Sequence, residues 1–160
     1  MRFFIGVVLL VISGFVNADV FDNFRSESDH VTKEIGCAKP KLITGNKDLA
    51  GLYGCIAGVG ETVKLFINEK VGTGKVNNVK LMWNDWTKDL GDGLHTDQFL
   101  AKKWVSVVAT MYAPKQVEEV VSTFFNSKNK KIESSTHIIE YTYYVGPAID
   151  ERLLTITSKQ

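Results

Sequence analysis

The longest apolar run of the chain lies at its N-terminus, from residue 3 to residue 15, after the single basic residue Arg2. The sequence Val16-Asn17-Ala18 follows, with the small-residue pattern that a signal peptidase cleaves. A run of about 13 residues is too short to cross a hydrocarbon core of about 30 Å as a helix. The pattern therefore predicts a cleaved secretory signal peptide over residues 1–18 and a single α+β domain over residues 19–160. An uncleaved N-terminal anchor is the alternative.

Further along the chain, two segments alternate between apolar and polar residues, at 63–67 and 79–83. Alternation with β-branched and aromatic residues is typical of half-buried strands. The intervening Gly72-Thr73-Gly74 is turn-forming, so the two segments predict an antiparallel hairpin. Residues 138–145 and 153–157 repeat the alternation on either side of a Gly-Pro break and predict a second hairpin.

Helical spacing dominates elsewhere. Residues 19–35 predict a short N-terminal helix that Gly36 ends. Between the hairpins, a helix capped by Thr96 is expected to bury one face, formed by Leu100, Trp104, Val107, Val108 and Met111. Pro114 ends this helix and can begin a second, in which the buried face comprises Val117, Val120, Val121, Phe124 and Phe125.

These elements together predict the fold class and its architecture. We expect an α+β domain with an antiparallel sheet of four to five strands, built from two hairpins. A pair of helices should pack on one face of the sheet, beside the short N-terminal helix.

The predicted export determines how the cysteines are interpreted. The chain has two, Cys37 and Cys55. In a secreted domain this number predicts a disulfide, which would join the end of the N-terminal helix to the Gly-rich stretch 51–60. Closing this loop would stabilise the fold by about 3 kcal/mol. Two thiolates do not complete a zinc site, and no histidine lies at metal-binding spacing from either cysteine. We expect an exported protein of the periplasm or the extracellular space.

Charge restricts the classes of partner. The chain has 19 basic and 18 acidic residues, and removal of Arg2 with the signal peptide leaves 18 of each. A chain without net charge has no global attraction for nucleic acid or anionic lipid. We therefore expect no nucleic-acid partner and no stable membrane insertion after signal cleavage. The basic loop at Lys128, Lys130 and Lys131 is interpreted as a solvated loop.

Motifs for cofactors and metals are incomplete. Gly72-Thr73-Gly74-Lys75 lacks the first glycine and the final hydroxyl residue of a phosphate-binding loop. The acidic segment that starts at Asp85 has Leu90 where a calcium loop requires glycine. His137 and Glu140 point to opposite faces if their segment is a strand. We therefore predict neither a cofactor nor a metal site.

Catalysis is not indicated by any local motif. The G-x-S-x-G nucleophile sequence does not occur, and no serine has a distinctive context. Because catalytic groups can assemble from distant positions, a cofactor-independent hydrolase that uses His95 or His137 remains an alternative. We assign no catalytic residue and expect a protein that is not an enzyme.

Aromatic residues supply the remaining candidate site. Trp83, Tyr141 and Tyr143 share the parity of neighbouring apolar residues and are predicted to be core. Two segments are distinctive, namely WNDWTKD from Trp83, with two tryptophans, and GPAIDER from Gly146, which forms a turn and ends in Arg152. Aromatic and arginine side chains are common anchors of protein recognition. We therefore predict contacts in the 84–95 loop and the 146–152 turn, with Trp86, Asp85, Asp92, Tyr144 and Arg152 as candidate binding residues.

The functional hypothesis is a small exported protein that binds another macromolecule, a protein in the first instance, as an inhibitor, escort or accessory factor. One alternative is a carrier of an apolar ligand, held between the helices and the sheet. The hydrolase is the other.

Overall fold

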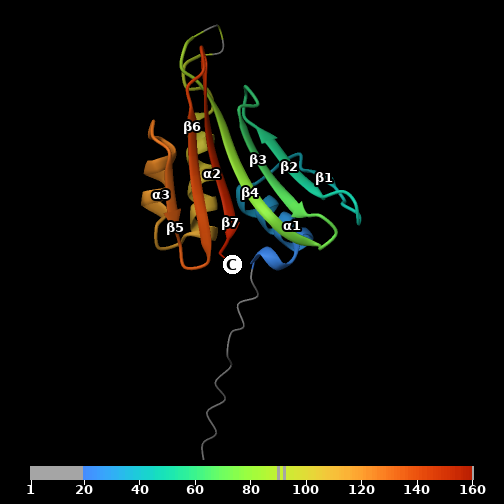
Figure 1. Cartoon of the computed structure of the whole chain (residues 1–160). Coiled ribbons are helices and arrows are strands. Elements are labelled where there is room, and N and C mark those ends of the chain that lie inside the picture. The colour runs from blue at the N-terminus through green and yellow to red at the C-terminus, as the bar shows by residue number, and fades with distance from the viewer. Residues whose placement is uncertain (1–19, 90, 92, 160) are drawn as a thin grey trace, which may run out of the picture.

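A single antiparallel sheet organises the molecule (Figure 1), as seen in a computed structural model that describes residues 20–89, 91 and 93–159. Its seven strands lie in the order β1-β2-β3-β4-β7-β6-β5. The bounds are β1 Lys41–Ile43, β2 Leu52–Ala57, β3 Val63–Lys70, β4 Lys75–Trp86, β5 Lys130–Glu133, β6 His137–Tyr144 and β7 Ile149–Ser158. The proposed signal peptide, residues 1–18, lies outside the described residues.

The helices pack on one face of this sheet. A short 3-10 turn, η1 (Val20–Asp22), precedes α1 (Phe24–Ile35), and α2 (Gln98–Tyr112) and α3 (Val117–Phe124) connect β4 to β5. Asn23 caps α1 by accepting a hydrogen bond from the Ser26 backbone N–H, and Gly36 ends the helix in the left-handed conformation. Among the described residues, no helix combines the length and the apolar character needed to traverse a membrane.

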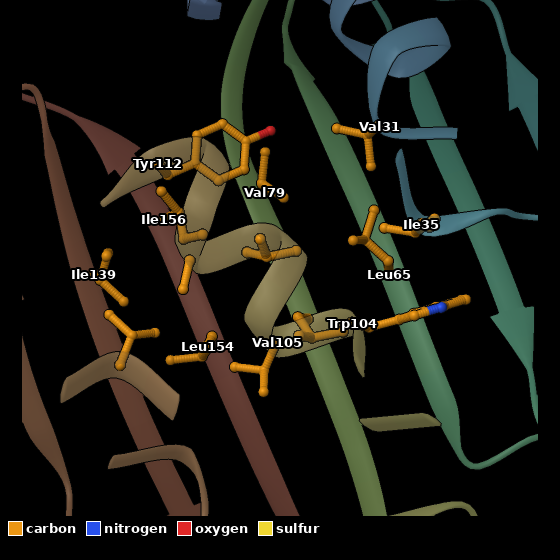
Figure 2. Close-up of a cluster of buried hydrophobic side chains, with 14 of the residues drawn as sticks. Val31, Ile35, Leu65, Val79, Trp104, Val105, Tyr112, Ile139, Leu154 and Ile156 are labelled. Carbon is orange, nitrogen blue, oxygen red and sulfur yellow. The ribbon is translucent and has the colours of Figure 1, made fainter. Parts of the chain in front are cut away.

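The strand register explains which side chains form the core. Cross-strand pairs on the helix-covered face include Val63 with Trp83 and Leu81 with Leu154, and all four side chains are fully buried. Figure 2 shows how side chains from α1, α2 and the sheet meet in this core, among them Val31, Ile35, Leu65, Val79, Trp104, Val105, Tyr112, Ile139, Leu154 and Ile156. On the opposite face, which we call the open face, the alternate residues of β3, β4 and β7 are half-buried. Apolar and polar residues therefore alternate along the strands because one face of the sheet packs against helices and the other does not.

Most of the predicted architecture is confirmed, and the number of strands is wrong. The α+β class, the antiparallel sheet, the helix pair and the N-terminal helix are present, but the sheet has seven strands instead of four to five. The segments that we did not predict as strands are β1, β2 and β5. The stretch 51–60 looked like a Gly-rich loop, and β5 begins within the predicted basic loop 126–131.

Helix ends and faces also differ from the prediction. Thr96 does not cap α2; the residue before the helix is Asp97, and its side chain makes no capping hydrogen bond there. The helix is turned slightly from the expected face, so that Leu100, Val107 and Met111 are only partly buried. The face that packs on the sheet comprises Ala101, Trp104, Val105, Val108, Ala109 and Tyr112. Pro114 does not begin the next helix, which starts at Val117.

The predicted disulfide is confirmed. Cys37, directly after the glycine that ends α1, is bonded to Cys55 in β2, with 6.2 Å between their Cα atoms. The bond therefore joins α1 to the outer part of the sheet. It also favours an oxidising compartment.

Candidate functional site

Three connecting segments meet at one end of the sheet, the upper end in Figure 1. They are the β2–β3 turn (58–62), the β4–α2 segment (87–97) and the β6–β7 turn (145–148). The backbone N–H groups of Thr87 and Lys88 donate to the Ala148 carbonyl oxygen at 3.0 and 3.3 Å, which joins the second segment to the third. We call this end the tip. The C-terminal end of β7 lies at the opposite end of the sheet.

The carboxylate of Asp97 attaches the β2–β3 turn to the start of α2. Its two oxygens accept hydrogen bonds from the backbone N–H groups of Val59, at 2.8 Å, and Gly60, at 3.1 Å, and from the hydroxyl of Thr62, at 2.9 Å. The Asp97 backbone has a φ of 62°, in the left-handed region that most residues avoid. Three bonds to one side chain offset that cost and fix the turn against the helix.

A buried ion pair lies beneath the tip. Asp85, at the end of β4, and Arg152, in β7, point toward the helix-covered side, and Arg152 Nε donates to Asp85 Oδ2 at 2.9 Å. The two side chains are 1% and 9% exposed. Breaking such a pair by removing one partner costs about 3 to 5 kcal/mol, because the other charge stays buried. The pair therefore fixes the position of the two segments that continue into the tip.

Arg152 makes a second set of contacts with its Nη1 atom. It donates to the carbonyl oxygens of Asn126, at 2.8 Å, and Phe124, at 3.3 Å, and to the hydroxyl oxygen of Tyr141 at 3.2 Å. Burial lowers the pKa of the Arg152 guanidinium, but its hydrogen bonds to Asp85 and Tyr141 raise it by more. The guanidinium is thus a permanent charge that also connects α3 to the sheet.

His95 is the second hydrogen-bonding partner of the Asp85 carboxylate. Its Nδ1 lies 2.6 Å from Asp85 Oδ1, so the ring donates to the carboxylate. The His95 backbone has a φ of 54°, and its N–H donates to the Trp86 carbonyl oxygen at 2.8 Å. The imidazole is half exposed. An oriented histidine of this kind can serve as a general base when a nucleophile is close. None of the hydroxyl groups in the described part of the chain is hydrogen-bonded to its ring.

Large apolar side chains are exposed around the tip. Val59 is 98% exposed, and Leu94 and Val145 are mostly exposed in the neighbouring segments. Phe99, in the first turn of α2, is 91% exposed, and Tyr144, the last residue of β6, is 69% exposed. Scattered apolar residues are normal on a surface; here three of the five lie on the tip segments, and Tyr144 and Phe99 lie within two residues of those segments.

The predicted site residues divide into two groups. Tyr144 is exposed, and Trp86 is half-buried on the open face, paired with Ile149 of β7. Asp85 and Arg152 are buried and hold the tip from within. Asp92 lies outside the described residues. The structure thus brings together the WNDWTKD and GPAIDER segments, which carry the two members of the ion pair.

Sequence analysis named His95 only as a candidate residue of the alternative hydrolase, and it missed Asp97 as a member of this site. The distinctive composition of the 84–95 loop was the available signal for His95. Nothing in the sequence indicates that both residues have positive φ. Among the described residues, no group of three or more His, Cys, Asp or Glu side chains could hold a metal ion.

Comparison of this chain with protein-family models, with curated proteins and with solved structures finds no match.

Proposed function

We propose that this protein is exported and acts by binding another protein through the tip, without catalysis of its own. The observation that carries the proposal is the contrast between the interior and the surface of the tip. The interior has the buried pair Asp85–Arg152, and the surface has exposed apolar side chains such as Tyr144 and Val59.

Rigid support of the segments favours binding for a physical reason. Loops and side chains lose conformational freedom when a complex forms, and this loss costs free energy that the contacts must offset. In this protein, the bonds to Asp97 and Ala148 restrain the described residues of these segments before any partner arrives. Exposed tyrosines such as Tyr144 are among the residues that contribute most to protein recognition.

A protein partner fits the tip better than nucleic acid or an anionic membrane. The exposed side chains named above are apolar, and the chain beyond residue 18 has balanced charge. The disulfide between Cys37 and Cys55 is consistent with a partner in the periplasm or outside the cell.

Site-specific photocrosslinking tests the proposal. A photoreactive phenylalanine analogue at Tyr144 should give a discrete adduct in the native envelope or medium. The matched control is Val71, an exposed apolar residue of the β3–β4 turn at the opposite end. The mass of the recovered protein also shows whether the chain begins near Asp19.

Affinity then identifies the contact residue. With the partner isolated from the adduct, Tyr144→Ala should weaken binding about thirtyfold, the factor for a contact worth about 2 kcal/mol. Val71→Ala should leave affinity unchanged. Equal crosslinking at both positions, or equal loss of affinity in both variants, would refute a tip-specific function.

A further inference from the structure

A second candidate site lies away from the tip, on the open face of the outer strands. A hollow of about 340 Å³ opens over β1, β2 and β3. Small-molecule sites typically range from about 300 to 1,000 Å³, so the hollow has room for one small ligand. Its floor and walls include four apolar side chains, namely Ile43, Leu52, Ile56 and Phe66.

Gly54 forms the floor of this hollow. It lies in the middle of β2, opposite Lys41 on one side and Phe66 on the other. Its backbone is not in the left-handed region, so the strand conformation itself does not require glycine. A Cβ atom at this position would lie 3.3 Å from the Phe66 ring. Glycine inside a strand often marks a place where a ligand approaches closely, and here it leaves space beside an aromatic ring.

Charge at the rim indicates the chemistry of the ligand. Lys39 and Lys41 line the hollow and are exposed, and neither forms an ion pair with another described residue. Glu61, in the β2–β3 turn, also lines it, which leaves one net positive charge. Two lysines over an apolar floor complement a molecule with one anionic group and an apolar body.

We propose that the hollow binds a free apolar monocarboxylic acid, such as a medium-chain fatty acid. Its carboxylate contacts Lys41 and Lys39, and its apolar body lies over Gly54 against Phe66. Ile43 and Ile56, which are 61% and 47% exposed in the protein alone, are covered by the ligand. Apart from Glu61, which belongs to the β2–β3 turn, the residues that line this site lie outside the tip, and neither Tyr144 nor the Asp85–Arg152 pair takes part in it.

The experiment is a titration of the purified, exported protein followed by amide chemical shifts. Decanoate is the probe, used below the concentration at which it aggregates. Decanol and decylamine, with the same chain length and a neutral or cationic end, are the comparison ligands. We expect saturable shifts at residues 41, 54, 56 and 66 with decanoate, and affinity about tenfold lower for decylamine.

Two variants and a control separate this site from general hydrophobic adsorption. Lys41→Glu should weaken decanoate binding about five- to tenfold by replacing an attraction with a repulsion. Gly54→Val should abolish binding by filling the floor. Lys103→Glu, the same charge change at an exposed position on α2, should have no effect.

Three outcomes would overturn the proposal. They are decanoate and decylamine binding equally, Lys41→Glu behaving like Lys103→Glu, and shifts that do not saturate. Lys41 is exposed, so Lys41→Glu should remain folded. If Gly54→Val does not fold, the comparison of Lys41→Glu with Lys103→Glu still decides the proposal. None of these outcomes involves Tyr144 or a protein partner.

Discussion

Among the buried carboxylates on the helix-covered side of the sheet, Asp85 and Glu27 are satisfied in different ways. Asp85, beneath the tip, is paired with Arg152 and receives a further hydrogen bond from His95. Glu27, on the buried side of α1, accepts a hydrogen bond from the hydroxyl of Tyr112. No cation of the described residues forms an ion pair with Glu27, which is 3% exposed.

The consequences for protonation differ accordingly. Burial raises the pKa of Glu27, and the Tyr112 hydrogen bond and the charge of His30 only partly oppose this effect. Burial, the nearby Glu27 charge and their hydrogen bond raise the pKa of Tyr112 well above 10, so Tyr112 remains a donor. Arg152 compensates the charge of Asp85 beneath the tip. Glu27 instead lowers the free-energy cost of its buried charge by taking up a proton. The tip is thus held by a permanent ion pair, and the α1 contact depends on pH.

The most direct way to break this contrast is to remove the cation. Arg152→Met keeps an unbranched apolar stem but removes the guanidinium, and it should lower the free energy of unfolding by about 3 to 5 kcal/mol, since Asp85 is left buried without its main partner. Chemical denaturation measures the loss.

The double variant Arg152→Met with Asp85→Leu is the control. It removes both charges and should be more stable than Arg152→Met alone. A loss below about 1 kcal/mol in the single variant would show that the pair does not hold the tip.

The second prediction concerns Glu27 and pH. A raised pKa in the folded state means that the folded protein binds the proton more tightly than the unfolded chain. The stability linked to this group is therefore complete below about pH 4.5 and is lost as the pH rises through the folded-state pKa. Glu27→Gln cannot titrate, so its stability relative to the original protein should increase across that range.

Denaturation curves from pH 4 to pH 8 test this prediction. The substitution also changes the free energy of unfolding by an amount that does not depend on pH. This constant difference between the two proteins should stay within about 1.5 kcal/mol, the net value of one hydrogen bond. Glu118→Gln, an exposed acid in the first turn of α3, is the matched control. Parallel curves for the original protein and Glu27→Gln would contradict a desolvated Glu27.

The smallest expected effect is at His95. Its ring is half exposed, so His95→Gln should cost about 1 kcal/mol or less while Arg152 still compensates Asp85. Amide chemical shifts should change in the 87–97 segment and stay constant in α1. A loss as large as that of Arg152→Met would mean that the histidine, and not the arginine, is the main partner of Asp85.

The missed strands show which local features hide a strand from sequence analysis. β2 contains Gly54 and is followed by Gly58 and Gly60, so its composition resembles a loop. β5 is four residues long and three of them are charged, which suits an edge strand that must avoid pairing with other chains. β1 has three residues, too few for a pattern to develop.

The candidate site was predictable in composition and not in arrangement. The composition of the 84–95 and 146–152 segments, with the adjoining Tyr144, identified Asp85, Trp86, Tyr144 and Arg152 together. No pattern along the chain separates the exposed Tyr144 from the buried Arg152, because a charged residue on a strand is normally placed toward solvent. Only the pairing of β4 with β7 shows that Asp85 and Arg152 compensate each other.

By itself, the sequence determined what depends on neighbours along the chain. Alternation established the long strands, helical spacing established the helix pair, and two cysteines established the disulfide. The tertiary structure decided what depends on residues far apart. Asp85 and His95 meet Arg152 because β4 and β7 pair side by side, and the hollow at Gly54 exists because β1 and β3 flank β2. Burial and charge compensation are properties of that surrounding space, so they appear only when the strands have come together.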